Sequence, residues 1–134
     1  MTEKQPKTGN FAAWEDLVVS ILSVNNYSLE KTYCCINGLR EQGLFSPENL
    51  IRWNPGEIGS RLKSAGYDRG RFMTGLFAQR LTALGMLIAS TGPEVCTKII
   101  SSTDPTAIKA LLLPVHGIGP RVIDNFCILR EIQK

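Results

Sequence analysis

Apolar residues recur along the chain at the three- and four-residue spacing that is typical of amphipathic helices. After Asn10 the apolar positions form one broad stripe, made of Phe11, Trp14, Leu17, Val18, Ile21 and Leu22. Ser28 is suited to cap a second helix, and Gly43 is suited to end it. Because no segment shows sustained two-residue alternation, the pattern predicts helices and no sheet.

Three later helix starts combine a capping residue with proline at the first helical position. They are Ser46-Pro47, Asn54-Pro55 and Asp104-Pro105. The helices expected from these and the remaining signals lie near 47–53, 55–64, 70–89, 93–100 and 105–113, and from Pro120 to near the end of the chain. The sequence therefore predicts an all-α fold, a compact bundle of about eight helices.

Length and charge add two points to this picture. The 134 residues fit one domain, and we expect a polar N-terminal tail over 1–10 followed by a helical domain over 11–134. A net charge of +3 is too small to indicate nucleic acid by itself. Most of the positive excess, however, falls between residues 61 and 80, where Asp68 is the one acidic residue; the basic residues there are Arg61, Lys63, Arg69, Arg71 and Arg80.

Targeting and metal-binding signals are both lacking. Residues 1–10 have no apolar core like that of a signal peptide, and no run approaches the length of a membrane helix, so we expect a cytoplasmic protein with no membrane partner. Four cysteines, at positions 34, 35, 96 and 127, form no C-x-x-C pair. Reduced thiols are expected, without a metal site or an iron–sulfur cluster.

The most informative motif is Val115-His116-Gly117-Ile118-Gly119-Pro120-Arg121. Between two helices it predicts a tight turn in which Gly117 and Gly119 let the backbone approach a ligand closely. Ile118 should anchor the turn, and Pro120 suits the first position of the next helix. Free amides at that helix N-terminus favour an anion, and a plain turn between helices is the alternative.

Four motifs occur in order along the chain: Ile21-Leu22-Ser23-Val24-Asn25-Asn26, Gly43-Leu44-Phe45-Ser46-Pro47-Glu48, Ala65-Gly66-Tyr67-Asp68-Arg69-Gly70-Arg71, and the hairpin. Each is weak alone, but together the chain resembles the helix-hairpin-helix superfamily of base-excision DNA glycosylases, particularly its endonuclease III-like branch. The resemblance covers most of the chain. It implies a helix-hairpin-helix motif at about 105–132, with double-stranded DNA as the partner.

By this resemblance the hairpin would hold the DNA backbone without reading its sequence. The DNA-binding residues then expected are His116, Gly117, Ile118, Gly119, Pro120, Arg121, Lys63, Arg69 and Arg71. His116 replaces the family's usual proline and, when protonated, would add a weak charge contact. Asn25 or Asn26 stands near the place of a family glutamine that fills the gap left by a flipped base. Loop or capping chemistry is the alternative for both asparagines.

The catalytic residues of the family have no counterpart in this sequence. Where bifunctional relatives carry a lysine, Arg121 occupies or adjoins the position, and a guanidinium stays protonated and cannot form the Schiff base of lyase chemistry. The family's catalytic aspartate and its iron–sulfur cysteines would lie beyond Lys134. The sequence therefore predicts no catalytic residue and no cofactor.

Three functions remain open on the sequence alone. The first is a non-catalytic or truncated DNA-binding domain of glycosylase ancestry. The second is a monofunctional glycosylase using another carboxylate, with Asp104 and Asp124 as candidates. The third is a protein-interaction module that has lost DNA binding. Phe11, Trp14 and their apolar neighbours are also expected to expose a face that favours self-association or a partner protein.

Overall fold

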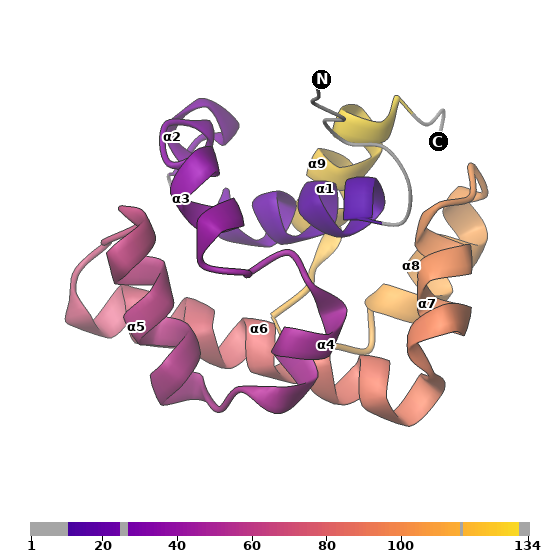
Figure 1. Cartoon of the computed structure of the whole chain (residues 1–134). Coiled ribbons are helices and arrows are strands. Elements are labelled where there is room, and N and C mark those ends of the chain that lie inside the picture. Colours follow the sequence, from indigo (N-terminus) through magenta and orange to yellow (C-terminus); the bar gives the residue numbers. More distant parts are fainter. Residues whose placement is uncertain (1–10, 25–26, 116, 132–134) are drawn as a thin grey trace, which may run out of the picture.

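A computed structural model describes residues 11–24, 27–115 and 117–131. This part of the chain contains nine α-helices and no strand (Figure 1), which confirms the all-α prediction. The helices are α1 (Phe11–Leu22), α2 (Leu29–Tyr33), α3 (Ile36–Glu41), α4 (Pro47–Arg52), α5 (Pro55–Ala65), α6 (Arg71–Thr91), α7 (Pro93–Ile100), α8 (Pro105–Leu112) and α9 (Pro120–Arg130).

The start signals that were read from the sequence lie at helix N-termini. Ser28 and Asn54 each accept a hydrogen bond from a first-turn amide, of Lys31 and Glu57 respectively. Asp104 accepts from two amides at the start of α8. Ser46 stands at the N-cap of α4 but makes no such bond, and Asn10 lies outside the described residues.

The single helix expected after Ser28 is two helices in the structure. The segment after Ser28 breaks at Cys34 and Cys35, so these cysteines lie between α2 and α3 rather than inside a helix. Cys35 has φ −116° and ψ 22°, which is not helical, and it redirects the chain into α3. The new direction brings Gly38 so close to α5 that a Cβ there would collide with the carbonyl oxygen of Ala65. The apolar spacing continues through the break, which is why it predicted one helix.

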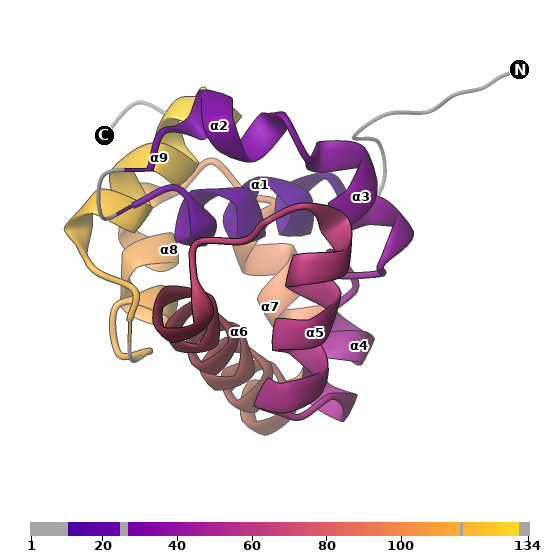
Figure 2. The same ribbon diagram turned by 90° about the vertical axis from the view of Figure 1, so that its left-hand side faces the viewer.

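The centre of the fold is α1. It lies above α6 in Figure 1, and Figure 2 shows other helices on several sides of it. Every residue from Ala12 to Leu22 is buried. Trp14 is 1% exposed, and its Nε1 donates to Thr97 Oγ1 at 2.9 Å. The expectation that Trp14 and its neighbours expose an apolar face is therefore wrong, while the Phe11 side chain lies outside what the structure describes.

Burial of α1 extends to two carboxylates. Glu15 is 5% exposed and receives two hydrogen bonds from Arg40 of α3, at 2.9 and 3.0 Å. Asp16 is 1% exposed and receives one from Arg130 of α9, at 3.3 Å. These pairs attach α1 to a neighbour on each side, because a buried carboxylate without a partner would be costly.

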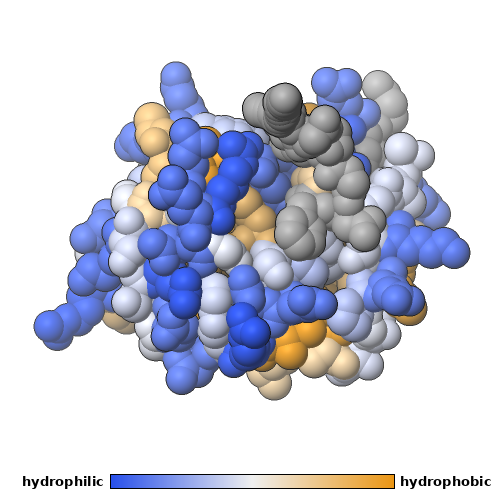
Figure 3. All heavy atoms as spheres, viewed as in Figure 1, coloured by the Kyte–Doolittle hydropathy of each residue, from blue (hydrophilic) through white to orange (hydrophobic). Residues whose placement is uncertain are grey.

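The longest helix, α6, packs against α1, α4, α5 and α7. In the described part of the chain it alone is long and apolar enough to cross a membrane, with 39% of its most apolar window buried. The expectation that no run approaches that length is therefore wrong as regards length and composition, while the absence of a membrane partner stays a prediction. Exposed large apolar residues lie on α6 and elsewhere, and comprise Ile51, Phe72, Met86, Val95, Leu113 and Ile128. Figure 3 shows an apolar patch at the lower edge, over α4 and α6.

Tyr67 joins the loop after α5 to the end of α1. Its ring is fully buried, and its hydroxyl donates to the carbonyl oxygen of Leu22 at 2.6 Å. Burial raises the pKa of Tyr67 to about 12, although the nearby Arg69 lowers it. The phenol is therefore expected to remain neutral in the folded protein at pH values where it ionises in the unfolded chain.

This raised pKa predicts a loss of stability in alkali. The contribution is fully present below the unfolded pKa of 10.0 and is lost as the pH rises towards the folded value of about 12. We expect urea unfolding to show a decrease of about 2 kcal/mol across this range. The variant Tyr67→Phe should remove that part of the pH dependence. If the free energy of unfolding of the variant decreases equally steeply with pH, other groups cause the decrease.

Candidate nucleic-acid interface

The turn between α8 and α9 holds the residues of the glycine motif. Gly117 has φ +93°, a conformation that favours glycine, and a Cβ added there would lie 2.7 Å from Cδ of Arg80. Ile118 is 4% exposed, and its N–H donates to the carbonyl oxygen of Val115 at 3.1 Å. Ile118 thus anchors the turn as expected, and Gly117 is required by both its backbone angle and its neighbour.

Gly119 differs from Gly117. Its φ of −112° and ψ of −171° are open to any residue, and an added Cβ would meet nothing within 4 Å. Of the two glycines, Gly117 alone has a backbone angle that favours glycine. What glycine provides at position 119 is open space directly in front of the backbone.

Gly119 is the N-cap of α9 and has no side chain to cap it. The amides of Arg121 and Val122, in the first turn, have no carbonyl acceptor among the residues that the structure describes. Such amides point out of the helix and carry the positive end of its dipole. The start of α9 can therefore accept an anion from solution.

A cavity of about 460 Å³ lies in front of this helix end. It is lined by Val24, Arg80, Gly117, Gly119, Pro120, Arg121 and Val122. Arg121 is exposed, whereas Nε of Arg80 is buried without a hydrogen-bond partner. The lining residues include two guanidinium groups and no carboxylate. The cavity is therefore positively charged, which complements a phosphate.

Arg80 was not among the residues expected from sequence to contact DNA. It comes from α6, and its side chain runs beneath Gly117, with the guanidinium 4.8 Å from the ring centre of Phe77. The indication in the sequence was that Arg80 lies in the basic segment between residues 61 and 80. Only the packing of α6 against the turn shows that this arginine meets the hairpin.

The other basic residues that were expected to bind DNA do not line the cavity. Arg69 donates from Nη1 to the carbonyl oxygen of Val24 at 3.0 Å and lies over the Tyr27 ring at 4.4 Å. These contacts give Arg69 a structural role. Lys63 is exposed in the last turn of α5, and Arg71 is exposed at the start of α6. Both remain predicted phosphate contacts outside the cavity.

The end of α1 is fixed beside the hairpin. Val24 lines the cavity, and Asn125 of α9 donates from Nδ2 to the carbonyl oxygen of Ser23 at 3.2 Å. Asn25 and Asn26 follow directly but, like His116, lie outside the described residues. The structure therefore brings the segment leading to the two asparagines to the hairpin and leaves their gap-filling role a prediction.

No family model, curated protein or solved structure matches the chain.

The resemblance to helix-hairpin-helix glycosylases thus rests on the four sequence motifs. Three of them lie near one another in the structure, because Val24 and Arg69 are joined by a hydrogen bond and Val24 lines the hairpin cavity. The fourth, around Ser46 and Pro47, begins α4.

The candidate carboxylates lie elsewhere. Asp104 is the N-cap of α8, where its Oδ1 accepts from Thr106 and Ala107 at 3.1 and 3.3 Å. Asp124 is exposed on α9, and neither carboxylate lines the cavity. Within the described ranges no group of three potential metal ligands lies together. The expected absence of a cofactor stays a prediction.

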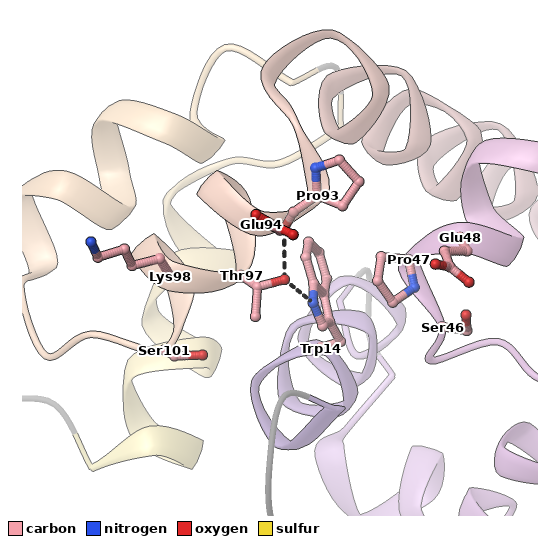
Figure 4. A pocket seen from close by; sticks show the side chains of 9 residues that line it. All are labelled: Trp14, Ser46, Pro47, Glu48, Pro93, Glu94, Thr97, Lys98 and Ser101. Atoms are coloured by element: carbon pink, nitrogen blue, oxygen red, sulfur yellow. Dashed lines mark hydrogen bonds between the residues drawn. The ribbon is translucent and has the colours of Figure 1, made fainter.

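A second cavity, of about 600 Å³, lies between α1, α4 and α7 (Figure 4). Trp14 donates to Thr97 Oγ1 at 2.9 Å, and Thr97 donates to the carbonyl oxygen of Pro93 at 2.7 Å. Its charged lining residues are mixed, with Glu48 and Glu94 against Lys98. Trp14 and Thr97 already have hydrogen-bond partners, and the charges of the lining residues are mixed. This cavity therefore does not favour an anion as the hairpin cavity does.

Proposed function

We propose that this protein is a DNA-binding domain that holds the phosphate backbone of the double helix at the N-terminus of α9. The observation that carries the proposal is the hairpin cavity, where an uncapped helix end faces Arg80 and Arg121. A phosphate bound there would accept from the amides of Arg121 and Val122 and from both guanidinium groups. Backbone phosphates are the same in every sequence, so binding would be non-specific.

Ancestry from base-excision glycosylases is part of the proposal and is supported by the four sequence motifs. In that reading the domain binds DNA and lacks the family's lyase chemistry, since Arg121 stands at or beside the position of the lyase lysine. Asp104 supports no second function, because its carboxylate already caps α8.

Weak, salt-dependent binding to duplex DNA is the expected result. If two to four phosphates are neutralised, log K should fall with log salt with a slope between about −1.8 and −3.6, and Kd should be about 10⁻⁴ to 10⁻⁶ M at physiological salt. Fluorescence anisotropy of a labelled duplex at several salt concentrations measures both quantities. No binding at low salt, or binding indifferent to salt, would contradict the proposal.

Matched arginine variants locate the contact. Arg80→Met and Arg121→Met should each reduce the size of the slope by about 0.9, because each removes one phosphate contact and keeps an apolar stem. Arg52→Met is the control, since Arg52 is exposed on α4 and lies outside the cavity. Equal effects of all three changes would show that binding follows overall charge and does not depend on the hairpin.

A further inference from the structure

Phe72 is the most exposed large apolar residue of the described chain. It is 79% exposed in the first turn of α6, and the fold gives it no packing role that explains an aromatic ring. Its neighbour Arg71 is also exposed. A ring so exposed beside a cation is accessible to a flat partner.

The position of Phe72 relates it to the hairpin cavity. Phe72, Leu76 and Arg80 follow one another at four-residue spacing, so they lie along one side of α6, and Arg80 lines the cavity. Eight residues of helix separate Phe72 from Arg80 by about 12 Å along the axis. A DNA strand carries one phosphate per 3.4 Å of duplex axis, so a strand that runs along α6 would place the ring about three to four nucleotides from the hairpin phosphate.

Charge near the ring favours nucleic acid over an apolar protein partner. Of the five basic residues between positions 61 and 80, Arg71 is exposed next to the ring in sequence, whereas Arg61 pairs with Glu57 and Arg69 has a structural role; the one acidic residue there is Asp68. Asp68 is engaged locally, because its Oδ1 accepts from the N–H of Gly70 at 3.0 Å. An aromatic ring within a basic segment is the arrangement that binds unpaired bases, since the ring stacks on a base while the cations hold the backbone.

We propose that Phe72 is a stacking platform for unpaired bases in the DNA whose backbone the hairpin holds. The proposal rests on the proposed function and extends it, because it identifies the preferred partner as DNA with unstacked bases next to a duplex. An intact duplex would bind only at the hairpin. A duplex with a single-stranded extension would occupy both sites.

Binding to two DNA molecules tests the proposal. We expect a duplex with a single-stranded extension to bind about tenfold more tightly than the blunt duplex of the same sequence, because base–aromatic stacking is worth about that factor for one base. Phe72→Ala should remove this preference and leave binding to the blunt duplex unchanged. Met86→Ala is the matched control, since Met86 is 69% exposed on the same helix, about 21 Å further along.

A second readout reports stacking directly. Phe72→Trp should keep the preference, and the fluorescence of the new indole should be quenched by the extended duplex. Met86→Trp should show no such quenching beyond that of the native tryptophans. Equal quenching at both positions, or a preference that survives Phe72→Ala, would overturn the assignment to Phe72.

The remaining outcomes separate the two proposals. If neither DNA binds at low salt, the proposed function itself fails. If the blunt duplex binds with the expected salt slope but the extension adds nothing, only the role of Phe72 fails. Sedimentation of the protein alone, before and after Phe72→Ala, identifies a self-association surface, and a change there would also overturn the stacking role.

Discussion

Replacing Gly119 by aspartate is expected to stabilise the protein while reducing its affinity for duplex DNA by more than about tenfold. The N-cap position of α9 has no side chain, and an aspartate there could accept from the amide of Val122. A carboxylate at the positive end of a helix dipole is favourable, so we expect a gain of about 0.5 kcal/mol in the free energy of unfolding. The same carboxylate would occupy the phosphate site and repel its ligand.

Two variants control this experiment, with unfolding in urea and DNA anisotropy measured for each. Gly119→Asn should cap α9 similarly but reduce binding less, since it blocks the site without a negative charge. Gly117→Ala should lower stability instead, because φ is +93° and the new methyl would contact the Arg80 stem. If Gly119→Asp binds duplex DNA as tightly as the parent, the phosphate does not lie at this helix end.

Replacing Arg40 by methionine is expected to lower the free energy of unfolding by about 2 kcal/mol, less than for a fully buried pair because the Arg40 side chain is 42% exposed. Glu15, with a side chain 7% exposed, would lose the guanidinium that now donates to both of its oxygens at 2.9 and 3.0 Å. A buried carboxylate without a partner retains its desolvation cost, which is the main reason for the expected loss. Urea unfolding at neutral pH measures the change.

The surface pair Glu57–Arg61 provides the control. Its atoms are 2.6 Å apart, but its side chains are 44% and 33% exposed, so Glu57→Gln should cost less than about 1 kcal/mol. The double variant Glu15→Leu/Arg40→Met should recover much of the stability, because it removes both charges. Equal losses from Arg40→Met and Glu57→Gln would show that water already screens the Arg40–Glu15 pair.

Local signals in the sequence predicted most of the helices. Proline after a capping residue marks the starts of α5 and α8, and the side chains of Asn54 and Asp104 make the expected bonds. Gly66, with φ +103°, ends α5 close to the expected bound at residue 64. These features depend on contacts within a few residues, which a sequence pattern contains.

Features that depend on contacts between residues far apart in the sequence could not be predicted from the local pattern. The break at Cys35 accompanies the close approach of Gly38 to Ala65, 27 positions later in the numbering. The role of Arg80 depends on how α6 packs under Gly117. The full burial of α1 could not be predicted from local pattern, because the partners of Glu15 and Asp16 lie on α3 and α9.

Burial of α1 has a consequence for the order in which the protein assembles. Asp16 is hydrogen-bonded to a residue 114 positions away, so the Asp16 side of α1 is not covered until α9 has been made. Contacts of such long separation slow folding, because closing a long loop precedes the gain from packing. During synthesis the Asp16 side of α1 would be open to chaperones until α9 is made, whereas the Trp14 side is covered earlier by α7, which carries Thr97.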